Sequence, residues 1–182
     1  MDAPELLQLL REKAEAVQVV VQEIPDLDAA CRYTVDLTRS QGGATLAAPG
    51  WDPASLPVLQ DLCGKAGIEL LTENLRAQAT RLHTGLTLAD WGLAETGTLV
   101  LESSSEDRRL ATMLTETHVA VLPVSRLQPE VGAIEEELNR LMQSPPRYLA
   151  FITGASRTAD IERVLTLGVH GPLELHLLLL KD

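Results

Sequence analysis

Aromatic and basic residues are scarce in this sequence. Phe, Trp and Tyr make up 3% of the 182 residues, so the core has to be built mainly from Leu, Val, Ile and Ala. Lys and Arg number 15 against 26 Asp and Glu, which gives a formal net charge of -11. Proteins that bind nucleic acids or anionic membranes need a basic surface for phosphate groups. The acidic balance therefore argues against both classes.

Cysteine is equally rare, with Cys31 and Cys63 as its two occurrences. An iron–sulfur cluster usually takes four thiolates, so this chain cannot hold one by itself. The four histidines are scattered, and none has acidic or thiol neighbours at the spacing of a zinc site. We therefore expect neither a metal nor another cofactor in this chain.

Long apolar runs are missing as well. A wholly apolar run such as Leu177–Leu180 is far shorter than the roughly 20 residues of a membrane-spanning helix. The N-terminal segment MDAPELLQLLREKAEAV carries acidic residues early and has helical spacing, which is unlike a signal peptide. We expect no membrane span, and the cytoplasm is the expected location.

The pattern of apolar residues predicts a single α/β domain over residues 1–182, in three layers with a mostly parallel sheet. Helical spacing and end signals predict helices at 4–16, 27–40, 54–65, 106–115, 129–142 and 159–167. Short β-branched or apolar runs predict strands at 17–24, 44–50, 68–71, 118–123, 147–152 and 173–180. The first helix is expected to pack on the domain, and Arg108-Arg109 to lie on a solvated helix face.

The decapeptide TGASRTADIE, residues 153–162, places many polar side chains after the apolar strand YLAFI, which we expect to be buried. A helix beginning near Thr158 would direct free backbone N–H groups at an anion, and Arg157 can add a bidentate contact. Local structure also explains the same segment without a ligand. Gly154 would make the turn, the hydroxyl of Ser156 or Thr158 would cap the helix, and Asp160 would be an acidic residue in its first turn. The residues alone leave both interpretations open.

Two further segments combine glycine with groups capable of chemistry. Residues 90–103 predict two strands around a tight turn at Thr96-Gly97, and Glu95 beside this turn is either a partly buried acid or a solvated turn residue. In GVHGP, His170 stands between two glycines. It is either an acid–base group or anion ligand, or simply a loop residue.

Taken in order, these segments resemble motifs of the LUD-domain family. The matching residues are AETGTLVL (94–101), LP (122–123), ITGASRTADIE (152–162) and GVHGP (168–172). The resemblance is strong over roughly residues 85–180 and weaker before them. It implies a fold like that of the CoA transferases, glucosamine-phosphate isomerases and ribose-phosphate isomerases, an α/β sheet covered by helices.

The resemblance also implies a role in the bacterial oxidation of L-lactate to pyruvate, together with iron–sulfur partner proteins. The clusters would lie in the partners, and this chain would support assembly, bind a ligand or complete a site. One alternative is an independent enzyme that acts on a phosphorylated or CoA-type substrate, with Glu95 as its reactive acid. A regulatory or structural interaction module is the other.

We expect residues 95–98, 153–160 and 170–171 to converge on one pocket at the carboxyl edge of the sheet, where open α/β sheets bind ligands. The expected ligand is an anionic small molecule, either a carboxylate such as lactate or a phosphorylated cofactor. Arg157 and the helix N-terminus would hold the anion, and Glu95 or His170 would move protons. The other residues expected to bind the ligand are Thr96, Gly97, Thr98, Gly154, Ser156, Thr158, Asp160 and Gly171.

Overall fold

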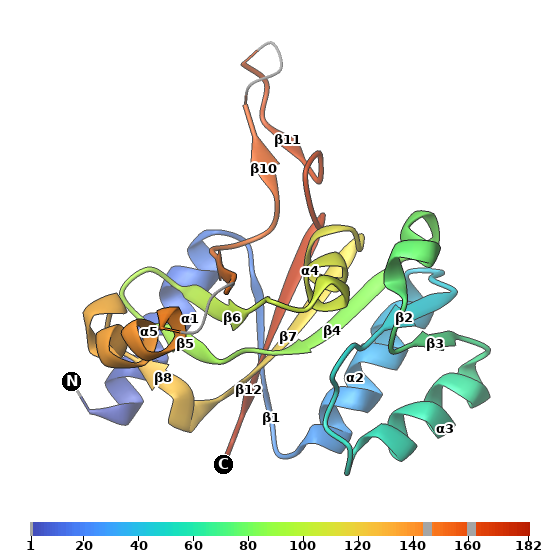
Figure 1. Ribbon diagram of the computed structural model, residues 1–182, viewed down its shortest axis with the longest axis horizontal. Coiled ribbons are helices and arrows are strands. Elements are labelled where there is room, and N and C mark those ends of the chain that lie inside the picture. Colours follow the sequence, from blue (N-terminus) through green and yellow to red (C-terminus); the bar gives the residue numbers. More distant parts are fainter. Residues whose placement is uncertain (1, 144–146, 160–162) are drawn as a thin grey trace.

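A six-stranded parallel sheet forms the centre of the protein (Figure 1). The computed structural model describes residues 2–143, 147–159 and 163–182. The sheet has the order β1-β12-β7-β4-β2-β3, and every neighbouring pair in it is parallel. Its strands are β1 (Val20–Ile24), β2 (Thr45–Ala47), β3 (Glu69–Leu71), β4 (Thr84–Leu88), β7 (Thr117–Pro123) and β12 (Glu174–Leu180). The predicted α/β class with a mostly parallel sheet is confirmed.

Two smaller sheets accompany the central one. A four-stranded sheet has the order β8-β5-β6-β9, with the bounds Leu127–Gln128, Trp91–Leu93, Thr98–Glu102 and Leu149–Ile152. Its antiparallel pair β5–β6 confirms the hairpin predicted around Thr96-Gly97. A two-stranded ribbon pairs β10 (Arg157–Thr158) with β11 (Thr166–Leu167).

Different elements cover the two faces of the central sheet. Along β7, Val119 and Val121 pack with the helices α2 (Leu27–Ser40) and α3 (Leu56–Ala66). Ala120 and Leu122 point to the opposite face, where α1 (Ala3–Ala16) and strand β6 of the smaller sheet meet them. The second face is thus covered by α1 together with a sheet, rather than by helices alone. Outside the smaller sheet lie the 3-10 turn Val131–Ile134 and α5 (Glu135–Met142).

Capping residues fix the ends of the well-predicted helices. The carboxylate of Asp26 accepts a hydrogen bond from the backbone N–H of Ala29 at 2.6 Å and begins α2. At the start of α1, Asp2 and Glu5 form a reciprocal capping box. Gly67 ends α3 in the left-handed conformation, with φ at 69°. In the described part of the chain, no helix is both long and apolar enough to span a bilayer.

The sequence patterns missed strand β4, which lies in the middle of the sheet between β7 and β2. Its sequence TGLTL resembles a loop because Gly85 and two threonines interrupt the apolar pattern. The glycine is needed because α4 (Glu106–Met113) crosses β4 very closely. A Cβ at Gly85 would lie 2.0 Å from the carbonyl oxygen of Ala111.

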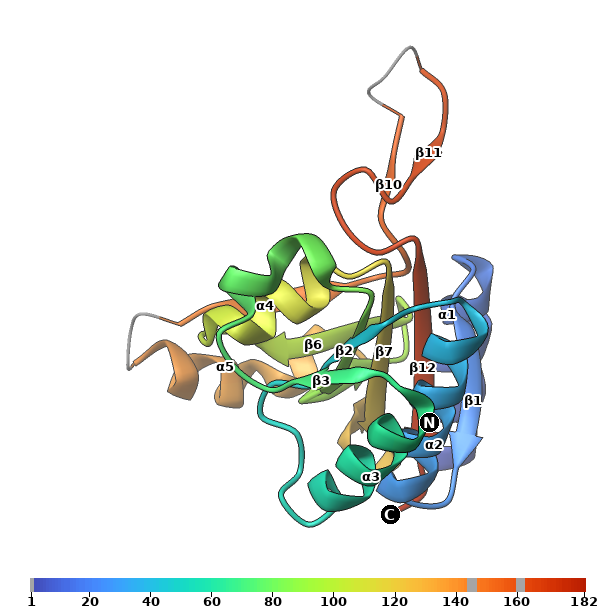
Figure 2. The same cartoon turned by 90° about the vertical axis from the view of Figure 1, so that its right-hand side faces the viewer.

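The helix predicted over 159–167 is wrong, because residues 163–167 are a turn and a strand and residues 160–162 lie outside the described residues. The backbone of the decapeptide pairs instead with the returning chain. The N–H of Ser156 donates to the carbonyl of Pro172 at 2.9 Å, and the N–H of Gly168 donates to Ser156 at 3.0 Å. Without this helix, its expected N-terminal anion site does not form. The ribbon stands out from the body of the protein in both side views (Figures 1 and 2).

Candidate functional site

A cavity of about 370 Å³ lies between α4 and strand β9. Its floor includes His118 and Leu175, which are the second residues of β7 and β12. These positions place the cavity at the amino ends of the parallel strands. We expected the pocket at the carboxyl ends of the strands, and this expectation is wrong. The segment that leads from the ribbon into β12 forms part of the cavity wall, and it lies at the amino ends of the strands.

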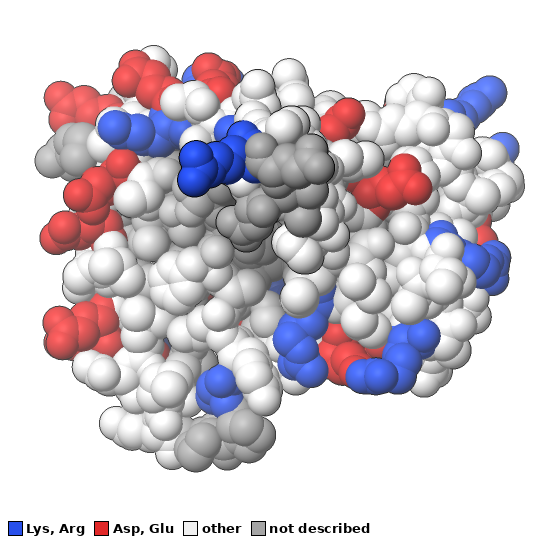
Figure 3. All heavy atoms as spheres, turned by 90° about the horizontal axis from the view of Figure 1, so that it is seen from above, with Lys and Arg blue, Asp and Glu red and all other residues white. Residues whose placement is uncertain are grey.

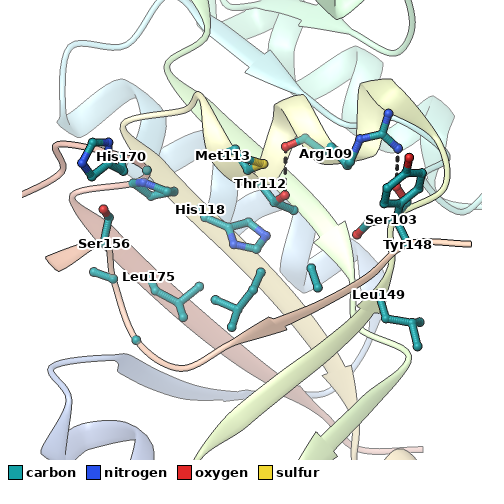
Figure 4. A pocket seen from close by; sticks show the side chains of 16 residues that line it. Ser103, Arg109, Thr112, Met113, His118, Tyr148, Leu149, Ser156, His170 and Leu175 are labelled. Carbon is teal, nitrogen blue, oxygen red and sulfur yellow. Dashed lines mark hydrogen bonds between the residues drawn. The ribbon is translucent and has the colours of Figure 1, made fainter. Parts of the chain in front are cut away.

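Apolar side chains line much of the cavity, and polar groups are spaced along it (Figure 4). The apolar lining includes Met113, Leu149, Ala150, Ile152, Ala155, Pro172 and Leu175. The polar lining consists of Ser103, Arg109, Thr112, His118, Tyr148, Ser156 and His170. Figure 4 shows Arg109 and Tyr148 at one end, His170 and Ser156 at the other, and His118 between them. An apolar cavity with a few separated polar groups is typical of a small-molecule site.

Arg109 supplies the positive charge of the cavity. Its Nη1 donates to the carbonyl oxygens of Ser103 at 2.6 Å and Ser104 at 2.9 Å, which fixes the guanidinium group. The guanidinium carbon lies 4.9 Å from the centre of the Tyr148 ring, in a cation–π contact. Of the described lining residues, Arg109 alone is a lysine or arginine. A fixed guanidinium beside an apolar cavity suits a ligand that carries an anionic group.

The expectation that Arg108-Arg109 lies on a solvated helix face is wrong for both residues. The neighbouring Arg108 donates to the carbonyl oxygens of Leu88 at 2.7 Å and Glu102 at 3.1 Å. Both arginines bind backbone carbonyl groups because α4 packs closely on β4 at Gly85, next to the loop that follows β6.

His118 enters the cavity as a neutral imidazole. The side chain is buried, and its Nε2 lies 2.9 Å from the hydroxyl of Thr87 on the neighbouring strand. Burial lowers the pKa of the His118 imidazole from 6.5 to about 4, because a charged ring would lose its hydration. At neutral pH, His118 can therefore donate a hydrogen bond to a ligand, or accept one from it, without carrying a positive charge.

Part of the predicted site does line this cavity. Gly154 and Ser156 of the decapeptide lie in its wall, as do His170 and Gly171 of GVHGP. A Cβ at Gly171 would lie 3.2 Å from the Cβ of Ser156, so these two segments touch each other. Thr158 lies in β10, and Asp160 lies outside the described residues.

Glu95 and its turn lie elsewhere. Among the described residues that line the cavity, none belongs to residues 95–98, and both Glu95 and Thr96 are exposed. Gly97 is buried against α1 with φ at 66°, and a Cβ there would lie 2.6 Å from the backbone nitrogen of Ala14. The expectation of one pocket formed by all three motifs is wrong for this turn, because its glycine packs against α1.

A chain of threonine hydroxyls links this turn to the decapeptide. The hydroxyl of Thr98 lies 2.7 Å from that of Thr96 and 2.6 Å from that of Thr153. Directly after the end of α1, Nη2 of Arg157 donates to the carbonyl oxygen of Val17 and to Oε1 of Gln18. The hydrogen bonds of Arg157 therefore fix the segment that joins α1 to β1.

A family model describing the LUD domain matches residues 7–180. The chain belongs to the LUD-domain family. Its fold is also that of a solved relative, a DUF162 family protein from Deinococcus radiodurans, with a TM-score of 0.69 over 99% of both chains at 19% sequence identity. At this identity, the likeness to the Deinococcus protein concerns the fold alone.

Curated relatives of this LUD-domain chain carry a functional name. Lactate utilization protein C from Macrococcus caseolyticus is 35% identical over 113 residues, which cover 60% of this chain and 48% of that protein. Lactate utilization protein C from Bacillus velezensis is 30% identical over 144 residues, covering 78% of this chain and 57% of the relative. The protein YkgG from Escherichia coli, named as uncharacterized, is 35% identical over 113 residues. The matches thus span about half the length of the curated relatives.

Sequence reasoning missed much of the cavity of this LUD domain. Arg109 lies on α4, His118 lies on β7 and Tyr148 directly precedes β9, so tertiary packing brings them to the cavity. Two local signals pointed toward them. Tyr148 is one of two tyrosines in a chain poor in aromatics, and His118 follows Thr117 at the beginning of a strongly apolar strand.

Proposed function

We propose that this chain serves in L-lactate utilization as a subunit without a redox centre, binding an anionic small molecule in the cavity between α4 and β9. Iron–sulfur partner proteins would take up the two electrons released when lactate becomes pyruvate. The observation that carries the proposal is the cavity with the fixed guanidinium of Arg109, found in a chain related to proteins named lactate utilization protein C.

The chemistry of the two cysteines supports a redox role for the partners. Cys31 and Cys63 are buried and free, and burial raises the pKa of each thiol to about 11. A protonated thiol in an apolar core is a poor metal ligand and a poor nucleophile. Neither cysteine is therefore suited to carry electrons to or from lactate.

The cavity favours a ligand with an anionic end and an apolar body. Arg109 replaces Arg157 as the anion-holding residue, because the hydrogen bonds of Arg157 go to Val17 and Gln18. Neutral His118 and the hydroxyl of Thr112 would orient the polar atoms next to the charged end. Ser156 and His170 lie at the other end and would contact the remainder of the ligand.

Calorimetric titration with L-lactate, pyruvate and inorganic phosphate tests this cavity. We expect Arg109→Gln to weaken binding of the anion that the wild type binds by about tenfold or more, because a charge-assisted hydrogen bond is lost. Arg76→Gln is the matched control and should leave the affinity unchanged, because Arg76 is exposed and pairs with Glu106 outside the cavity. Equal affinities of the two variants, or no binding of any of the three anions, would contradict the proposed site.

The role in lactate utilization is tested in the native host after deletion of this chain. We expect loss of growth on L-lactate, restored by the wild-type chain, and capture of cysteine-rich iron–sulfur proteins by a tagged copy. Unimpaired growth would overturn the proposed function. Lactate oxidation by the purified chain alone with an artificial electron acceptor would show instead that the redox chemistry takes place here.

A further inference from the structure

Exposed apolar side chains gather at the end of the molecule that carries the ribbon. Of twelve large hydrophobic residues described as exposed, nine lie on the ribbon, at its base or on β9 and its approach. Figure 3 looks down on this end, where uncharged side chains cover much of the surface, a basic side chain lies beside the tip of the ribbon, and many of the acidic side chains lie toward the margins. The nine are Met113, Leu114, Tyr148, Phe151, Val164, Leu165, Leu167, Val169 and Leu173. A patch of this kind on a chain with a net charge of -11 is typical of a protein interface.

The ribbon is the most exposed part of this patch. We use the term arm for residues 156–159 and 163–169, which leave the body in both side views (Figures 1 and 2). Two residue pairs hold β10 to β11, and Val164 and Leu165 are 60% and 65% exposed. A two-stranded ribbon is marginally stable in water unless another surface covers it. A surface that covers the arm would therefore stabilise it.

A groove of about 590 Å³ at the base of the arm offers such a surface. Its lining includes Leu114, Glu116, Val169 and Leu173, and it shares Met113, His170 and Gly171 with the candidate ligand cavity. Gly168 and Val169 at the base of the arm line this groove, whereas neither Val164 nor Leu165, farther along the arm, is among the described residues that line it. The groove of one molecule can therefore receive the arm of another.

We propose that two copies of this chain form a dimer in which each arm lies in the groove of the other copy. A twofold axis then relates the two copies, so that each groove contains the arm of the other copy, as in an isologous interface. One pair of charges agrees with a second copy as the partner: the arm presents Arg163 next to Val164 and Leu165, and the groove presents exposed Glu116, whose Oε2 lies 3.8 Å from Nε2 of His83. Two strongly acidic chains repel one another over most of their surfaces, and the pairing of Arg163 with Glu116 at this end would offset part of that repulsion.

Sedimentation equilibrium of the full chain, from low to high micromolar concentration, measures this association. We expect the wild type to reach twice the monomer mass of 19.7 kDa. Val164→Asp should raise the dissociation constant by about tenfold or more, because a charge would be buried in an apolar contact. Val131→Asp is the matched control, because Val131 is 49% exposed and lies outside the patch, and it should leave the constant unchanged.

A charge exchange tests the pairing of arm and groove. Arg163→Glu should weaken the dimer, and adding Glu116→Arg to the same chain should restore its dissociation constant, because each contact would regain opposite charges. Both residues are exposed, so folding is expected to persist and circular dichroism verifies it. A wild type that stays monomeric would show that another molecule covers the patch. A dimer that Val164→Asp leaves intact, or a double variant without recovery, would equally overturn the reciprocal arrangement.

Discussion

Replacing Gly97 by alanine should lower the free energy of unfolding by about 3 kcal/mol, one of the two largest effects expected here. Two costs add at this position. Gly97 adopts the left-handed backbone conformation with φ at 66°, and placing an alanine in this conformation destabilises the folded state by about 1 kcal/mol or more. Its methyl group would also lie 2.6 Å from the nitrogen of Ala14 and 2.8 Å from the carbonyl carbon of Lys13. These are backbone atoms of α1, so relief of the clash requires the whole helix to move.

Gly67→Ala separates the two costs. Gly67 has nearly the same backbone, with φ at 69°, and a Cβ there would meet no atom within 4 Å. We expect this control to lose about 1 kcal/mol, which is the conformational cost alone. Urea unfolding followed by circular dichroism measures both variants, and an equal loss in the two would show that contact with α1 adds nothing at Gly97.

The position of Gly97 gives the ETGT motif a structural role. Gly97 contacts α1, the hydroxyls of Thr96, Thr98 and Thr153 connect the turn to the decapeptide, and Arg157 binds the segment that follows α1. Two motifs that are distant in sequence thus hold the N-terminal helix against the smaller sheet. This arrangement agrees with a family match that includes most of α1.

The elements that could be predicted from the sequence are those with a strong local pattern. The sequence predicts a helix at 27–40, closed by Gly42-Gly43, with the bounds of α2, and in the structure Asp26 caps its beginning. Strand β4 could not be predicted, because Gly85 is there to admit α4, a contact formed only in the folded chain. The ribbon was mistaken for a helix because its apolar residues have helical spacing, yet Val164 and Leu165 are exposed.

The candidate site was predicted only in part for the same reason. Ser156 and His170 belong to glycine-containing segments that mark loops, and loops often build sites. The Arg109 side chain points to the cavity because α4 packs on β4. The local sequence shows only an arginine on a polar helix face, so its place in the cavity could not be predicted. The pocket lies at the amino edge because β12 follows a ribbon, whereas the sequence pattern had suggested a helix there.

His118 should give the protein a marked sensitivity to mild acid. Its pKa is 6.5 in the unfolded chain and about 4 in the folded protein, so the unfolded state binds more protons between these values. Stability is therefore unaffected above pH 6.5 and falls as the pH decreases toward 4, by roughly 3 kcal/mol in total. Urea unfolding at a series of pH values measures the slope, and the upper part of the window is most informative because carboxylates titrate mainly below it.

Two variants assign this slope to burial of the imidazole. His118→Gln keeps a polar side chain near Thr87 without a titrating group, so it should remove most of the pH dependence in this window. Thr87→Val removes the hydrogen bond and leaves the ring buried, so the pKa of His118, followed by NMR, should stay well below 6.5. A normal imidazole pKa in the wild type would show that water reaches His118, and a ligand at this end of the cavity could then meet a charged histidine. With His118 neutral, Arg109 is the lysine or arginine among the described lining residues that offers a permanent positive charge to an anion.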